Sequence, residues 1–238
     1  MKRIRLPLGR SLFFVAAFLF AVVALIPLRA AIGWLSLDRQ GIAAQQALGS
    51  VWLGLFRQAQ LGPVPLGDLQ ARLRSLPLLV GRARVDLKRA GEEPFEGALS
   101  VSRDGFGLED ATGRVDVAAA FAPLPISSLQ LQDLSARFAS ERCLHADGKV
   151  SAAITGELAG LTSGSGFTGS ARCDGEALLL PLVSQSATQK LNVRLFPGGR
   201  FEAEFLLGAV DAATAQRLAA AGFTASGAGH RLEVSGKF

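Results

Sequence analysis

A run of 18 residues without a charge, at positions 11–28, most constrains how this chain can fold. As an α-helix rising about 1.5 Å per residue, it would be about 27 Å long, close to the hydrocarbon thickness of a bilayer. The run has no polar stripe, which excludes an ordinary amphipathic core helix. Four basic residues precede it, and this is typical of a segment whose N-terminus stays in the cytoplasm. We therefore predict a transmembrane anchor at 11–28, after a cytoplasmic tail at 1–10.

The rival interpretation of this run is a cleaved signal peptide, whose basic start and apolar stretch would look the same. A signal peptide needs small residues before its cleavage site, whereas Pro27, Leu28 and Arg29 stand there. Under either interpretation the rest of the chain is exported. The anchor predicts a single-pass protein of the cell inner membrane of a Gram-negative bacterium. A connector at 29–48, with a short helix near 42–48, would lead to a periplasmic β-rich domain at 49–238.

The net charge of +5 lies entirely in the N-terminal segment. Five basic residues and no acidic residue precede position 30, so the rest of the chain has as many basic as acidic residues. A neutral remainder offers no basic face for a nucleic acid, and we predict no nucleic-acid partner. Apolar residues make up 49% of the chain, which is enough to build a packed core.

From residue 50 onward, polar and apolar residues alternate with the period of two that is typical of β-strands. Clear examples are RVDVAAAF, KLNVRLF and RLEVSGK. Turn signals separate the strands, and Pro197-Gly198-Gly199 between two alternating runs predicts a hairpin. The predicted strands are 51–55, 58–61, 66–73, 83–87, 97–103, 114–121, 129–138, 149–158, 166–173, 177–183, 190–196, 200–207 and 231–237.

One helix interrupts the strand pattern near the C-terminus. Asp211 can cap the segment AATAQRLAAAG, and Gly222 can end it. Leu218 and Val210 would pack this helix on the sheet. The predicted fold is therefore mainly β, with an N-terminal transmembrane helix followed by a curved antiparallel β-sheet or open sandwich and one short helix near the C-terminus.

The sequence contains two cysteines, Cys143 and Cys173. In an exported domain an even pair favours a disulfide, which would close a loop of about 30 residues and contribute roughly 3–4 kcal/mol. Two separate buried thiols are the alternative. A metal site is disfavoured because only His145 lies near either cysteine in the sequence, and the other histidine, His230, is remote.

Patterns that would indicate catalysis are weak. An acyl-transfer triad would have to use His145 or His230, and both stand beside turn or loop residues. The stretch TSGSGFTGS lacks the GK[ST] ending and the following helix of a phosphate-binding loop. We therefore predict a protein that is not an enzyme and that has no cofactor and no metal.

Several short motifs occur in a fixed order along the chain. They are GSVWLG, LRSLPLLVGRARVDL, a cysteine element around RCLHADG, a second one in CDGEALLLPL, and the closing GHRLEVSGKF. Together with the N-terminal anchor, this ordered set resembles the protein N family of the bacterial type II secretion system. The positions that carry the resemblance are Gly49, Trp52, Gly54, Pro77, Gly81, Arg82, Cys143 and Cys173.

The resemblance implies a non-catalytic accessory component of a machine that moves folded proteins from the periplasm to the outside. Its partners would be components of the inner-membrane platform and the periplasmic channel, together with the inner-membrane lipid bilayer. The motif residues are expected to act structurally: the two glycines of GSVWLG allow a bend or close strand approach, Trp52 packs, and Pro77 and Gly81 bracket a turn. The alternative is a membrane-anchored periplasmic lipid-binding or lipid-transfer protein with a β-groove.

Overall fold

The computed structural model describes residues 8–29, 42–91, 93–122, 124, 126–154, 157–158, 161–162, 166–227 and 229–237. Residues 1–7 of the predicted cytoplasmic tail and residues 30–41 of the predicted connector lie outside this described part. The division of the chain into four segments, drawn from the sequence, therefore stays a prediction.

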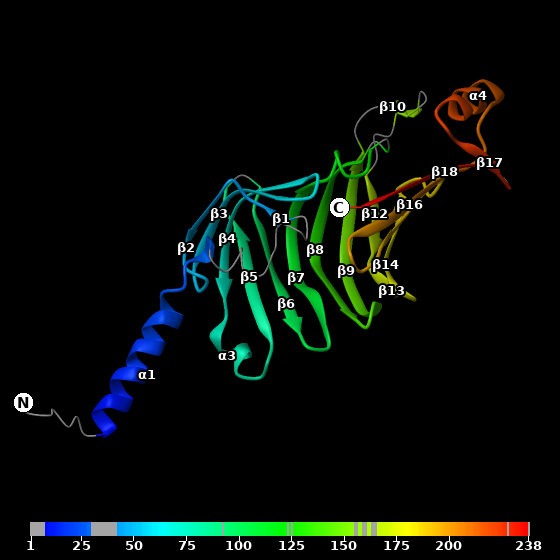
Figure 1. Cartoon of the computed structure of the whole chain (residues 1–238). Helices are drawn as coiled ribbons and strands as arrows, with labels where there is room; N and C mark the ends of the chain where they lie inside the picture. Colours follow the sequence, from blue (N-terminus) through cyan, green and yellow to red (C-terminus); the bar gives the residue numbers. More distant parts are fainter. Residues whose placement is uncertain are drawn as a thin grey trace, which may run out of the picture.

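A long curved β-sheet makes up most of the described chain, and a helix extends from its N-terminal end (Figure 1). The helices are α1 (Leu8–Ala24), α3 (Ser75–Leu78) and α4 (Ala212–Ala220). The strands of the first half are β1 (Ile42–Ala43), β2 (Gln46–Gly49), β3 (Gly54–Leu61), β4 (Val64–Leu73), β5 (Ala83–Arg89), β6 (Phe95–Ser102), β7 (Gly105–Asp116), β8 (Ile126–Ala139) and β9 (Arg142–Ile154). Those of the second half are β10 (Glu157–Leu158), β11 (Leu161–Thr162), β12 (Phe167–Ser170), β13 (Arg172–Asp174), β14 (Ala177–Ser184), β15 (Gln189–Leu195), β16 (Arg200–Leu207), β17 (Thr224–Ser226) and β18 (Gly229–Lys237).

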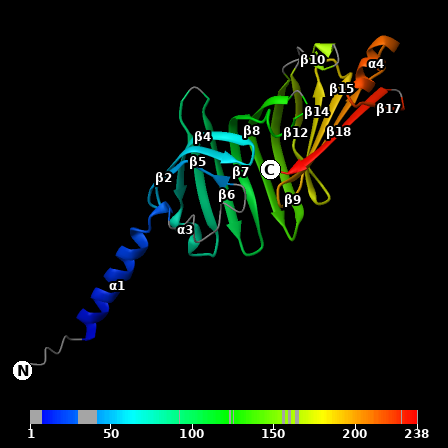
Figure 2. The ribbon, with the colours of Figure 1, turned by 45° about the horizontal axis from the view of Figure 1, so that its top comes forward.

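Within the described residues, sixteen strands form one antiparallel sheet in which most strands pair with their neighbours in sequence. The path runs β1-β3-β4-β5-β6-β7-β8-β9-β12-β14-β15-β16-β18-β17, while β2 pairs with β3 and β13 pairs with β14. The order departs from a simple meander at the C-terminal edge. There α4 follows β16 in the chain, and β18 lies between β16 and β17 and pairs with both. Strands β10 and β11 form a separate pair. Figure 2 shows the same sheet turned forward, with α4 and β17 at the end far from α1.

β-Bulges bend the first half of the sheet. Gln58, Asp110 and Asp133 have positive φ values of 49°, 51° and 51°, and the pairing register shifts beside each of them. An extra residue in one strand bends it and increases its twist. Side chains bind the backbone amides left free at these bulges: Asp68 Oδ1 accepts from the Gln58 amide at 2.9 Å. The curvature is therefore a built feature of the strands β3, β7 and β8.

One face of the sheet carries the core. Alternate residues of β14, β15 and β16, such as Leu182, Leu191 and Phe205, are buried on this face and lie opposite one another in register. Two segments cover this face in the second half. Phe121, from the connection between β7 and β8, packs against Phe201 with ring centroids 4.9 Å apart. Leu218 of α4 is fully buried in the same core cluster.

The mainly β fold, the antiparallel curved sheet and the short C-terminal helix are confirmed. The structure forms an open sheet with one long strand path. Asp211 is the N-cap of α4, and its side chain accepts a hydrogen bond from the Thr214 amide at 3.0 Å. The short helix expected near 42–48 is wrong, since β1 and β2 occupy those residues and pair with β3. Backbone pairing with a neighbouring strand outweighs the weak local helix signal there.

The N-terminal helix also differs from its prediction at 11–28. Helix α1 has 17 residues and ends at Ala24, and no helix within the described residues is both long and apolar enough to cross a membrane. The last residues of the predicted span contact the sheet instead: Pro27 forms an isolated bridge with Ser50, and Leu28 is buried. Proline has no amide hydrogen and its ring clashes with the preceding turn, which favours a helix end before it.

Candidate interaction surfaces

The junction between α1 and the sheet is built from the first motif. Leu28 packs directly over Gly54, where an added Cβ would lie 2.5 Å from Leu28 Cδ2. Gly49 has a φ of +88° and closes the turn before β3, where an added Cβ would lie 2.5 Å from the Leu53 carbonyl oxygen. Trp52 is half-buried in this turn. The glycines of GSVWLG therefore occupy places where a side chain would clash with the backbone or with Leu28.

The second motif forms the loop between β4 and β5. Pro77 lies in the single-turn helix α3, and Gly81, with a φ of +72°, lies in the turn that follows. The Arg82 amide donates to the Pro77 carbonyl at 3.0 Å, so the loop closes on itself. Three apolar side chains, those of Leu76, Leu79 and Val80, are nevertheless exposed. The family roles of these motif residues stay predictions.

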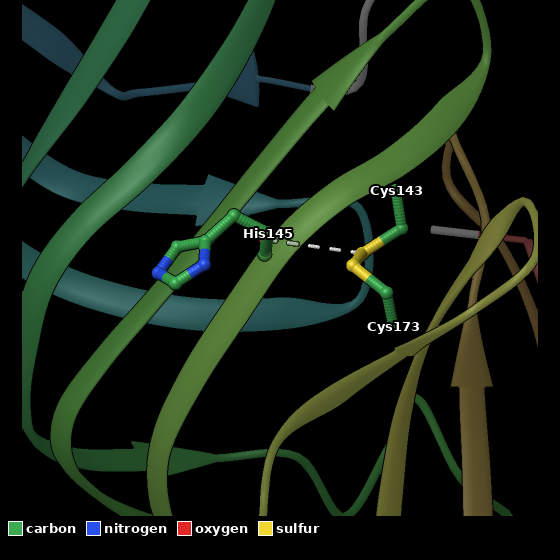
Figure 3. Close-up of a disulfide and its surroundings, with 3 residues drawn as sticks. All are labelled: Cys143, His145 and Cys173. Atoms are coloured by element: carbon green, nitrogen blue, oxygen red, sulfur yellow. Dashed lines mark hydrogen bonds between the residues drawn. A yellow bond between two sulfur atoms is a disulfide. The ribbon is translucent and has the colours of Figure 1, made fainter.

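A disulfide joins Cys143 of β9 to Cys173 of β13, with Cα atoms 5.4 Å apart. It lies at the seam between the two halves of the sheet. Strands β9 and β12 pair over four residue pairs, whereas β8 and β9 pair over eleven. Beyond the end of β12, the disulfide links β9 to β13 on the core side of the sheet. Figure 3 shows it beside β9, with the His145 imidazole pointing away from the sulfur atoms.

The face opposite the core has a hollow of about 280 Å³ over strands β6 to β9. Ser100, Gly107, Arg137 and His145 lie opposite one another in register across these strands. Residues that are directly opposite in antiparallel strands share a face. Gly107 has no side chain, which leaves the depression between its neighbours. We call this depression the glycine hollow.

Some arginines around the glycine hollow form ion pairs and others do not. Arg84, in β5, forms ion pairs with Asp86 and Glu109. Two guanidinium groups that line the hollow, those of Arg82 and Arg137, have no ion-pair partner among the described residues. Both are exposed. The hollow therefore presents two available guanidinium groups, which bind carboxylates. The Asp110 carboxylate also lines the hollow and accepts a hydrogen bond from Ser135 Oγ.

The core face stays partly open in the first half of the sheet. Val101 and Phe106 lie opposite each other on β6 and β7, and their side chains are 56% and 46% exposed. Phe106 stacks on the buried Phe138 with ring centroids 5.4 Å apart, which places all three on the core face. Leu99 beside them is also exposed.

The two histidines occupy different halves of the sheet. His145 is exposed in β9, 3.9 Å from an equally exposed Asp147 carboxylate. His230 is the second residue of β18 and lies opposite Leu207 in β16. No group of three or more histidine, cysteine or acidic side chains suited to a metal ion occurs in the described ranges.

Sequence reasoning did not find the glycine hollow, the burial of Leu28 or the exposure of the loop after β4. The first two depend on contacts between segments distant in sequence. The third had a readable signal, since LPLLV at residues 76–80, directly before Gly81, is an apolar run inside a turn.

The comparisons with known proteins agree with the motifs. Residues 40–232 match the model of the family described as type II secretion system, protein N. Comparison with curated proteins and with solved structures gives no significant match. The matched residues take in β1 to β17 and the first residues of β18, and thus nearly the whole sheet. This chain therefore belongs to the protein N family of the type II secretion system.

Proposed function

We propose that this protein is a non-catalytic accessory component that scaffolds or stabilises the periplasmic part of the type II secretion machine. The observation that carries the proposal is the family match across nearly the whole sheet. Family membership supports involvement in type II secretion and association with the cell envelope. The scaffolding role is the further step, and it rests on the surfaces described above.

The N-terminal segment holds the chain at the inner membrane in this proposal, as a single-pass anchor with its N-terminus in the cytoplasm and the sheet in the periplasm. Support comes from the exposed apolar side chains of α1, among them Leu12, Phe13 and Phe18, and from the basic residues before it. A 17-residue helix measures about 26 Å. A bilayer thins locally around a short apolar segment at a modest cost.

The glycine hollow is the docking surface that we assign to a partner within the machine. Its unpaired guanidinium groups, at Arg82 and Arg137, favour an acidic segment of a component of the inner-membrane platform or periplasmic channel. Charge complementarity of this kind raises the association rate and selects the partner. A scaffold needs such a surface and needs no reacting group.

The test is deletion of the gene, followed by measurement of how secreted enzymes divide between periplasm and medium. Retention in the periplasm, rescued by the wild-type gene but not by Arg137→Glu, is the expected result. Arg142→Glu is the matched control, because Arg142 is an exposed arginine of the same β8–β9 hairpin outside the hollow. Normal secretion in the deletion strain would refute the proposal.

The open apolar face favours a second candidate function, the binding or transfer of lipids. Val101, Phe106 and Leu99 offer an uncovered apolar strip that could hold an acyl chain. The measurement is lipid extraction from the purified full chain, compared with a Val101→Asp variant. Phospholipid that co-purifies with wild type and is lost from the variant would support this candidate. Absence of lipid from wild type would count against it.

A further inference from the structure

Three apolar features meet at one end of the sheet. The turn at 50–53 lies level with the end of β4, because Gly54 pairs with Ala71. The end of α1 is held at the same turn, since Pro27 bridges to Ser50 and the Val51 amide donates to the Ile26 carbonyl at 3.2 Å. The loop with α3 begins directly after β4. Figures 1 and 2 both show α3 beside the end of α1 that joins the sheet.

The exposed surface at this end is unusually apolar. Leu79 and Val80 are 83% and 81% exposed, and Leu76 is nearly as open. Leu25, at the end of α1, and Leu53, in the neighbouring turn, are exposed as well. Five large exposed aliphatic side chains at one end of the sheet are unfavourable in water and mark a contact site. We call this the loop patch.

The backbone amides of the loop are hydrogen-bonded in a way that suits the poorly hydrated interface of a bilayer. The amides of Leu79, Val80, Gly81 and Arg82 all donate within the loop, to the carbonyl oxygens of residues 76, 77 and 78 at 3.0–3.2 Å. Pro77 has no amide hydrogen. Entry of an apolar loop into a bilayer is costly when its amides lose water without another partner. Here these amides keep their partners.

Basic side chains surround the apolar tip. Arg72, Arg74 and Arg82 lie at the base of the loop, Arg29 follows the end of α1, and all four are exposed. Arg74 forms an ion pair with Asp86. Arg29, Arg72 and Arg82 have no ion pair among the described residues. An apolar tip with a basic collar matches the interface of a bilayer that contains anionic phospholipid.

We propose that the loop of residues 75–81 inserts its exposed leucine and valine side chains into the interface of an anionic bilayer, as a second membrane contact beside α1. This inference rests on the proposed anchoring of α1. It adds a second point of attachment, which fixes the tilt of the sheet above the membrane.

The test uses the full chain in vesicles of equal parts phosphatidylethanolamine and phosphatidylglycerol, with and without bromine on the acyl chains. Trp34 and Trp52 are replaced by Phe, and Leu79→Trp supplies the reporter fluorophore. The matched control is Leu61→Trp, in the hairpin at the opposite end of β4. Bromine should quench the reporter in the loop several-fold more strongly than the control.

Flotation of the same samples separates the two proposals. A chain that does not float with vesicles overturns both the anchor and this inference. A chain that floats but shows equal quenching at both positions overturns this inference alone. The exposed loop would then be assigned to a contact with a protein partner. Since the reporter variants could fail to fold, hydrogen exchange of the wild-type chain is measured as well. Exchange at residues 79–82 should be slower with phosphatidylglycerol than with phosphatidylcholine alone, and equal rates would contradict the proposal.

Discussion

Leu28 packs over Gly54, and the contact leaves no space for a side chain at position 54. A Cβ there would lie 2.5 Å from Leu28 Cδ2 and 3.3 Å from the Ser50 carbonyl oxygen. Leu28 is 8% exposed although it follows a helix whose apolar side chains are open. The contact, together with the bridge from Pro27 to Ser50, is what joins the end of α1 to the first strands of the sheet.

Gly54→Val should loosen this junction and lower the free energy of unfolding by about 1–3 kcal/mol, because a larger side chain must displace Leu28. Urea denaturation of the full chain in detergent measures the loss. Gly166→Ala is the control, since its Cβ would have its nearest neighbour at 3.6 Å. Leu28→Ala combined with Gly54→Ala should cost less than the two changes added. Simple additivity would show that the two residues do not act together.

Replacing both cysteines by serine should lower the free energy of unfolding by about 3–4 kcal/mol, because the disulfide closes a 30-residue separation. The loss should appear locally as faster hydrogen exchange in β13 and in the first part of β9, where no strand pairing with β12 exists. Treatment of the wild-type chain with dithiothreitol should reproduce the same change. Equal denaturation midpoints for oxidised and reduced protein would contradict a role at the seam.

The N-cap of α4 should make stability depend on acid. Hydrogen bonds from the hydroxyl and amide of Thr214 hold the pKa of Asp211 below its ordinary value of 3.8. A lowered folded-state pKa contributes stability above pH 3.8, and this contribution is lost as the pH falls through the folded value. Asp211→Asn should therefore lower Tm by a few degrees at neutral pH and have less effect well below pH 3.8.

Thermal melting of both chains across this pH range measures the effect as a difference, which cancels the contributions of other carboxylates. Asp86 is one of these. Burial acts to raise its pKa, but hydrogen bonds and charge from Arg74 and Arg84 outweigh burial and lower it. A difference between wild type and Asp211→Asn that stays constant with pH would show that the ionised cap has no role.

Arg137→Glu should abolish cross-linking of the protein to its secretion partner in cells while leaving the Tm of the purified chain unchanged. The guanidinium is exposed and has no ion-pair partner among the described residues, so the fold does not depend on it. Site-specific cross-linking in cells, with Arg142→Glu as control, measures the effect. Equal loss with both variants would indicate a general charge effect instead of a surface centred on the glycine hollow.

Local patterns predicted much of this fold. The alternation in KLNVRLF and in the strand at 200–207 was enough, because a strand with one buried face must place apolar residues at every second position. Asp211 was readable as a cap for the same local reason. Boundaries failed at the bulges: of the strand predicted at 114–121, only residues 114–116 belong to β7, which begins at Gly105 and passes through Asp110 with a positive φ.

The sequence by itself determined the β-rich character, the cysteine pair, the family and an apolar N-terminal segment, since each depends on neighbouring residues or on composition. Tertiary structure alone decided where that segment ends, because Leu28 is buried only once Gly54 lies beneath it. It also decided which apolar face is covered. Phe121 reaches Phe201 across 80 residues and covers the core face of one half, while Val101 and Phe106 stay open in the other. A face of the sheet is covered by contacts between segments that are distant in the sequence. The alternation of residues within one strand therefore does not predict which face is covered.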